Sequence, residues 1–134
     1  MRYYLLALAS GVVKNVYWHQ LIAPGYGLID DRDNKFTKYP AYIAFKTLLA
    51  HLTGTDFLKL NEKNGCYCAT FNKQSDTNKK IIIEVFWSTA GNHQMIDIDK
   101  ELQQLLTRDG ESLKVTNYKV NESPVYRITQ DSST

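Results

Sequence analysis

The chain has 134 residues, a length that suits one domain or a small domain with an appendage. Hydrophobic residues make up 43% of it, which excludes general disorder and is enough for one modest core. The formal net charge is only +2, and basic residues are scattered among acidic ones. This pattern gives no electrostatic footprint for nucleic acid or for an anionic membrane.

Residues 2–10 are apolar on nearly all sides and end at Gly11. A signal peptide is the alternative interpretation, but the segment has a single basic residue, Arg2, and is too short to span a bilayer. We therefore recognise no signal peptide and predict a buried helix that ends at a glycine C-cap. A helix that is apolar all round needs partners on every side.

Residues 12–18 are β-branched and then aromatic, which predicts a buried strand. A loop and a polar run follow, and Pro40 suits the first position of a helix at Pro40–Leu52. The apolar residues of that helix recur at intervals of three and four, which gives one apolar face: Ala41, Ala44, Phe45, Leu48, Leu49 and Leu52. Gly54 ends it. Residues 1–54 are thus predicted to form a helix, a strand, a loop and a helix, the order of elements typical of a repeating α/β fold.

From Thr55 onward, short β-type runs alternate with turn signals such as Asn64-Gly65 and Asp109-Gly110. The predicted strands are residues 57–60, 66–71, 81–87, 95–98, 102–106, 113–120 and 125–129. Their spacing predicts an antiparallel β-sandwich. The predicted fold class is α+β, mainly β: a sandwich at 55–134 preceded by a helix-strand-helix segment at 1–54. A single parallel strand cannot make a sheet, so that segment either docks on the sandwich or lacks its natural partners.

Cys66 and Cys68 stand two apart in a predicted strand, so their side chains point to the same face at a separation poorly suited to a disulfide. No cluster of His or Cys lies near them to complete a metal site. We expect two unpaired thiols, no metal and no cofactor. Free thiols favour a reducing compartment such as the cytoplasm.

The acidic residues do not assemble into a recognisable catalytic set. The loop acids, Asp30, Asp31 and Asp33, are expected to be solvated. Asp97 and Asp99 are expected to face solvent, opposite Ile96 and Ile98. Glu84, in the predicted strand at 81–87, is expected to lie at the surface. The loop is also a poor calcium site, because the twelfth position from Asp31 is a tyrosine.

Several short motifs, taken in order, carry a family resemblance. They are Val-Tyr-Trp-His-Gln-Leu at 16–21, Pro-Gly-Tyr-Gly-Leu-Ile-Asp at 24–30, Lys-Tyr-Pro-Ala-Tyr at 38–42 and Glu-Ser-Pro-Val-Tyr at 122–126. Together they resemble the C-terminal part of clan A glycoside hydrolases, which comprises the last strand and helix of a (β/α)8 barrel and a following β-sandwich. The resemblance covers most of the chain.

The resemblance implies that residues 3–10 correspond to the seventh barrel helix, 13–18 to the eighth strand and 40–52 to the eighth helix. A whole barrel needs about 250 residues. The two catalytic glutamates of that clan end its fourth and seventh strands, positions that would lie upstream of Met1. The resemblance therefore implies no glycosidase activity from this chain alone.

The resemblance also implies candidate sugar contacts, if the barrel were complete. Trp18 would form the floor of the sugar subsite, with His19 and Tyr26 as weaker neighbours. The competing interpretation of Trp18 is a core residue.

Two functions follow. The first is a non-catalytic C-terminal fragment whose sandwich supports a barrel carried by other residues or by another chain. The alternative is a free-standing β-sandwich module that binds carbohydrate or another partner through exposed aromatics, namely Tyr67, Trp87, Tyr118 and Tyr126. These aromatics alternate with apolar strand residues, however, a pattern that favours the core. Unpartnered apolar surface in the first segment also predicts homo-oligomers.

Overall fold

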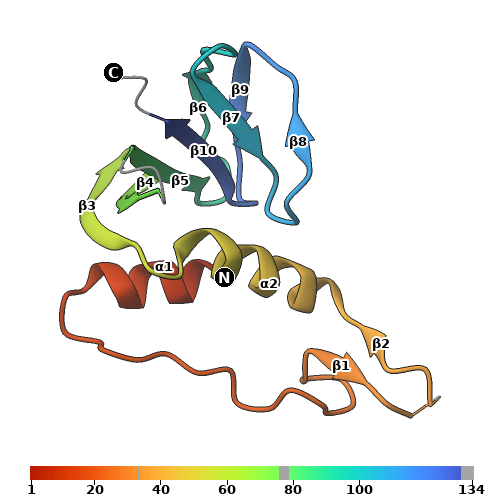
Figure 1. Cartoon of the computed structure of the whole chain (residues 1–134). Helices are drawn as coiled ribbons and strands as arrows, with labels where there is room; N and C mark the ends of the chain where they lie inside the picture. The colour runs from red at the N-terminus through yellow and green to blue at the C-terminus, as the bar shows by residue number, and fades with distance from the viewer. Residues whose placement is uncertain (33, 76–78, 131–134) are drawn as a thin grey trace.

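The computed structural model describes residues 1–32, 34–75 and 79–130. Two helices, α1 (Arg2–Ala9) and α2 (Pro40–Leu52), accompany strands that pair antiparallel (Figure 1). The strands in these ranges are β1 (Ile29–Asp30), β2 (Thr37–Lys38), β3 (Asp56–Lys63), β4 (Cys66–Gln74), β5 (Lys80–Ser88), β6 (Gln94–Asp97), β7 (Gln103–Leu106), β8 (Ser112–Leu113), β9 (Asn117–Val120) and β10 (Val125–Gln130). The predicted class, α+β and mainly β, is confirmed.

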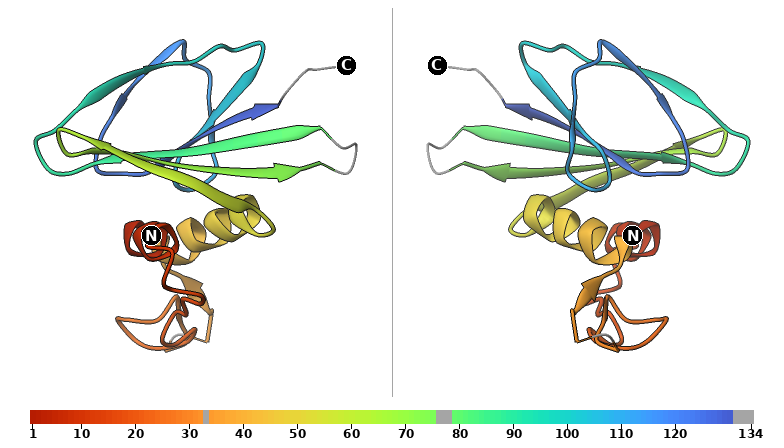
Figure 2. Two further views of the ribbon diagram at one scale, coloured as in Figure 1. Left: turned by 90° about the vertical axis from the view of Figure 1, so that its left-hand side faces the viewer. Right: turned by 90° about the vertical axis from the view of Figure 1, so that its right-hand side faces the viewer.

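The main sheet has six strands in the order β3-β4-β5-β10-β7-β8, and β6 pairs with β9 in a second, smaller sheet. Figure 2 shows both helices under one face of the main sheet and the β6–β9 pair over the opposite face. The two sheets meet in one apolar cluster made of Phe86, Ile96, Ile98, Leu105, Val120 and Val125. The main sheet is therefore the middle layer of three.

The alternation of side chains along β5 explains how one strand serves both layers. Ile83, Val85 and Trp87 belong to the cluster on the helix side, whereas Phe86 belongs to the cluster between the sheets. Trp87 is 2% exposed and its neighbour in the cluster, Tyr126, is fully buried. A strand that is buried on both faces reads as a continuous apolar run, which is why residues 81–87 show so little polar alternation.

The two helices contribute one face each to the helix-side core. Tyr4 and Leu5 of α1 and Leu48 and Leu52 of α2 are buried there with the sheet residues. The predicted α2 face is correct at its centre but too wide, because Leu49 is 47% exposed. Away from the sheet, both helices also carry exposed apolar side chains, such as Leu6 of α1 and Leu49 of α2.

The strand predicted at residues 12–18 is not formed. The segment carries no sheet pairing, and Val12 and Tyr17 are each more than four-fifths exposed. β-branched and aromatic residues favour a strand only when a neighbouring strand accepts their backbone hydrogen bonds and side chains. The described part of the chain supplies no such neighbour here.

The strand predicted at residues 113–120 is also divided. Its first part, β8, extends the main sheet beside β7, and its second part, β9, pairs with β6 in the smaller sheet. The Ile98 amide donates to the Thr116 carbonyl at the bend between the two parts. This segment therefore passes from one layer to the other, a change that periodicity alone does not reveal.

An arginine links the two sheets. The Arg127 Nε donates to Glu84 over 2.8 Å, and its Nη1 donates to the Asp97 carbonyl of β6 over 3.0 Å. Its guanidinium also lies over the Phe86 ring, 4.9 Å from the centroid. Only 21% of the Glu84 side chain is exposed, so this predicted surface acid is a half-buried ion-pair partner.

The two cysteines are unpaired, as predicted. Cys66 is buried, and Cys68 is half-buried beside the inter-sheet cluster. Burial, followed by the charge of Glu84, raises the pKa of Cys68 to about 11. The Cys68 thiol is therefore protonated at neutral pH and poorly reactive.

His51 gives the stability of this fold a pH dependence. Its ring lies 5.5 Å from the Tyr126 ring, and burial, helped by the charge of Lys73, lowers its pKa below the ordinary 6.5. The unfolded chain then binds a proton more readily, so the stability that neutral His51 contributes is complete above pH 6.5 and is lost as the pH falls. We expect wild type to lose more unfolding free energy than His51→Gln between about pH 7.5 and about pH 5.5 in urea titrations. Equal losses would contradict this assignment.

Candidate functional site

Trp18, the first candidate sugar contact, packs onto the two helices. Its ring is parallel to that of Tyr4, with centroids 6.3 Å apart, and it is tilted against Phe45 at 6.1 Å. Trp18 is half-buried and borders a small hollow of about 190 Å³ together with Met1 and Arg108. The side chain therefore joins the extended segment before it to the helix pair.

His19 and Tyr26, the other two candidates, lie next to each other. Their ring centroids are 6.4 Å apart with an angle of 28° between the planes. Both side chains are exposed, Tyr26 to 61%. None of the ring contacts among the described residues joins either of them to Trp18. The structure thus brings two of the three candidates together and directs the third towards the helices.

A network of polar contacts fixes the turn that carries Tyr26. The Tyr39 hydroxyl donates to Asp30 over 2.7 Å and accepts from the Gly25 amide over 3.3 Å. Gly27 is required at the close of this turn, because a Cβ there would lie 2.4 Å from the backbone nitrogen of Ala23. The position of Tyr26 thus depends on contacts within its own loop.

Asp30 corrects one prediction. It is not a solvated acid, because the Arg32 Nε donates to its carboxylate over 3.0 Å and its side chain is only 14% exposed. Hydrogen bonds from Arg32 and then from Tyr39 hold the pKa of Asp30 well below its usual range. Asp31, Asp97 and Asp99 are exposed as predicted, and Asp33 lies outside the described residues.

Three acids of the described structure have an arginine partner. Asp30, Glu84 and Asp109 are each bound to an arginine. A general acid needs a raised pKa, and the partner of Asp30 has the opposite effect. Within residues 1–32, 34–75 and 79–130 no three His, Cys, Asp or Glu side chains gather closely enough to hold a metal ion.

The helices of the described structure are also too short or too polar to cross a membrane.

The aromatic platform of the alternative function is largely inaccessible. Trp87 and Tyr126 are buried in the helix-side core. Tyr67 stacks on Trp87 with centroids 5.2 Å apart and planes nearly parallel, and Tyr118 is half-buried against the inter-sheet cluster. Trp87 and Tyr126 are therefore core residues, which was the competing interpretation of these rings, because the main sheet is covered on both faces around them.

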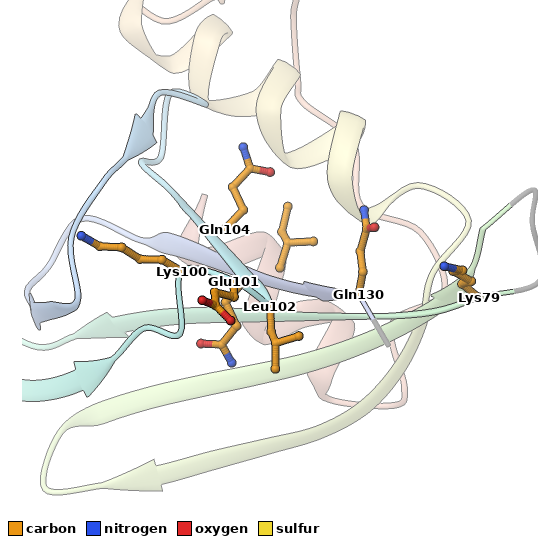
Figure 3. Close-up of a pocket in the computed structure, with 8 residues that line it drawn as sticks. Lys79, Lys100, Glu101, Leu102, Gln104 and Gln130 are labelled. Atoms are coloured by element: carbon orange, nitrogen blue, oxygen red, sulfur yellow. The ribbon is translucent and has the colours of Figure 1, made fainter. Parts of the chain in front are cut away.

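The sequence analysis missed a polar hollow of about 340 Å³ where β7 begins and β10 ends (Figure 3). Gln104 and Gln130 line it together with Lys79 and Lys100. Exposed glutamines and lysines follow no periodic pattern and belong to no motif, so no signal in the sequence points to this hollow.

The fold defined above is similar to part of a known enzyme structure. No family model and no curated protein sequence matches the chain. A solved structure described as a family 39 glycoside hydrolase from the gut symbiont Bacteroides cellulosilyticus WH2 superimposes with a TM-score of 0.74 over 96% of this chain, at 17% sequence identity. This chain spans 29% of the length of that protein. The likeness concerns the fold, and it is consistent with a fragment of a glycoside hydrolase.

Trp18 should anchor the extended segment without supporting the sandwich. In Trp18→Ala the ring contacts with Tyr4 and Phe45 are lost, each aromatic pair being worth about 0.5–1.5 kcal/mol. We expect limited proteolysis within residues 10–28 to accelerate by about tenfold, while amide exchange in β4, β5 and β10 changes little.

The matched control for this experiment is Tyr17→Ala, which removes a neighbouring aromatic that is 81% exposed. Its proteolysis should resemble that of wild type. Equal acceleration in both variants would show that Trp18 has no anchoring role.

Proposed function

We propose that this chain is the C-terminal part of a glycoside hydrolase, in which residues 1–54 complete a (β/α)8 barrel and residues 55–134 form a non-catalytic sandwich that supports it. The support is threefold: the order of short motifs along the sequence, the fold likeness to a glycoside hydrolase, and the distribution of exposed apolar side chains. The last of these carries the proposal.

The exposed apolar side chains are concentrated in the first segment. Of the fourteen large ones in the described residues, eleven lie before β3 and three lie in the sandwich region. The eleven are Tyr3, Leu6, Val12, Val13, Tyr17, Leu21, Ile22, Tyr26, Phe36, Ile43 and Leu49. Scattered exposed apolar residues are ordinary, but so uneven a distribution marks a surface that another structure covers.

A barrel suits this surface better than a free ligand does. The outer sides of α1 and α2 and the unpaired segment at residues 12–18 lie in the same part of the molecule, away from the sandwich (Figure 1). In a barrel, each helix packs on the strands inside it, and each strand pairs with a neighbour on both sides. One partner would then cover the exposed apolar side chains of the helices and also pair with the β-type residues at 12–18.

The sugar contacts assigned to Trp18, His19 and Tyr26 belong to this proposal. An aromatic ring face suits the C–H face of a pyranose, and a histidine nitrogen can bond a hydroxyl. His19 and Tyr26 already present neighbouring rings to solvent. Partners of the chain would then be carbohydrate and the barrel-bearing polypeptide.

The purified chain should not hydrolyse aryl glycosides. A retaining glycosidase needs two carboxylates about 5 Å apart, one of them with a raised pKa. Asp30 does not meet that need, because its hydrogen bonds lower its pKa. The assay is release of the chromophore from a panel of aryl glycosides over many hours, with a complete glycosidase as the positive control. Turnover that a single Asp or Glu substitution abolishes would refute the proposal.

The DNA sequence that precedes the codon of Met1 provides a second test of the proposal. A reading frame for a barrel, joined in frame or by a frameshift, supports the proposal. Clean non-coding sequence overturns it in favour of a free-standing module.

The chain alone should self-associate through its first segment. In Tyr17→Ser combined with Leu21→Ser, two side chains that are 81% and 54% exposed become polar. Losing even about 1.4 kcal/mol of apolar burial weakens association about tenfold. Sedimentation over a range of concentrations should show this shift towards the monomer.

The matched control for association is Met95→Ser, at a sandwich residue that is 57% exposed. It should associate like wild type. A wild-type chain that stays monomeric at every concentration, or a control that behaves like the double variant, would contradict the assignment of the interface to the first segment.

A further inference from the structure

The hollow shown in Figure 3 lies on a part of the main sheet that the helices leave open. Ile128 of β10 pairs with Gln104 of β7, and the two-residue period of a strand puts Gln130 on the same face as Ile128. This is the face that carries Tyr126 and Leu106 into the helix-side core. Gln104 and Gln130 are nevertheless exposed, so the face is uncovered at this end.

The carboxamides in the hollow have unused hydrogen-bonding capacity. No described group hydrogen-bonds the side chain of Gln104 or Gln130, although the neighbouring Gln103 accepts from the Asp99 amide over 3.1 Å. Each free carboxamide offers an acceptor oxygen and an NH2 donor. Figure 3 shows the Gln104 and Gln130 side chains projecting to the same side of the sheet from neighbouring strands. Such a pair complements the hydroxyls of a polyhydroxylated ligand.

The remaining lining adds apolar contact and positive charge. Ile128 is half-buried in the hollow, and Leu102 at its edge is 49% exposed. Lys79 and Lys100 border it with Glu101 as the acid in the lining, and none of the three forms a salt bridge with a described residue. The described residues that line the hollow therefore carry a net charge of +1, which favours an anion.

We propose that this hollow binds a short acidic oligosaccharide, with its hydroxyls on Gln104 and Gln130 and its carboxylates on Lys79 and Lys100. The volume of about 340 Å³ is at the lower end of the range for ligand sites. The proposal does not depend on the proposed function, because the hollow is built by the sandwich strands and lacks the residues of the first segment.

An acidic peptide fits these observations less well. A peptide would add to a free strand edge, but only Gln103 and Gln104 of β7 extend beyond the residues paired with β8, which is too short a template. The hollow also lacks an aromatic or deeply apolar recess to anchor a peptide side chain.

The test is an amide-shift titration of the full chain with a trisaccharide of galacturonic acid and, in parallel, with a trisaccharide of galactose. We expect shifts centred on residues 100–104 and 128–130. We expect the acidic sugar to bind about tenfold more tightly than the neutral one, because two lysines meet its carboxylates, and the preference should shrink as salt is added.

Paired variants separate the two contributions. Gln104→Ala with Gln130→Ala should weaken binding of the acidic sugar by about tenfold, through loss of two hydrogen-bonding groups. Lys79→Gln with Lys100→Gln should abolish the preference for the acidic sugar. Gln94→Ala, at an exposed glutamine of β6, is the matched control and should bind like wild type. All these positions are exposed, and unchanged shifts elsewhere in the spectra verify the fold.

Three results would overturn the proposal. The first is the absence of shifts at the hollow at millimolar sugar. The second is equal affinity for the acidic and neutral trisaccharides. The third is a triglutamate peptide that binds the hollow as tightly as the acidic sugar. The glycoside assays and the association measurements are independent of all three, so failure here leaves the proposed function untouched.

Discussion

The apolar layer between the two helices and the main sheet determines where the rest of this molecule lies. It joins Tyr4 and Leu5 at the start of the chain to Tyr126 near its end. An isolated helix of eight residues is not stable in water, so α1 exists because its buried side meets the sheet. The same contact orients α2, and with it the loop that leads to Tyr26. The first segment is therefore held in place by its packing on the sandwich.

This layer also decides which aromatics are available for binding. Trp87 and Tyr126 fill the core because the main sheet is covered on both faces around them. The accessible rings are those of the first segment, where Tyr17, Tyr26 and Phe36 are all more than half exposed. Among the described residues, the largely exposed aromatic rings thus lie in the first segment and not in the sandwich.

Sequence patterns predict the helices and strands whose form depends on neighbouring residues. They fail where the structure of a segment depends on residues far away in the sequence. Pro40 and the three-four spacing predict α2 to the residue, and the apolar run of β5 was evident. The segment at 12–18 has strong β propensity, but without an adjacent strand that propensity has no effect. The contacts of Asp30 with Arg32 and Tyr39 depend on the conformation of a turn that the sequence does not specify. Gln104 and Gln130 reach the same part of one sheet face only because β10 pairs with β7, although they are 26 positions apart in the sequence.

The exposed apolar surface of the first segment and the polar hollow of the sandwich differ in how favourably water solvates them. Exposed apolar surface costs about 25 cal/mol for each Å², so the rings and branched side chains of the first segment are more stable against a partner than alone. The carboxamides and ammonium groups of the hollow are well solvated and lose little without a ligand. A partner that covered the first segment would therefore stabilise the folded chain, whereas a ligand in the hollow would yield only the net gain of exchanging water for ligand. We therefore expect stronger association at the first surface than at the second.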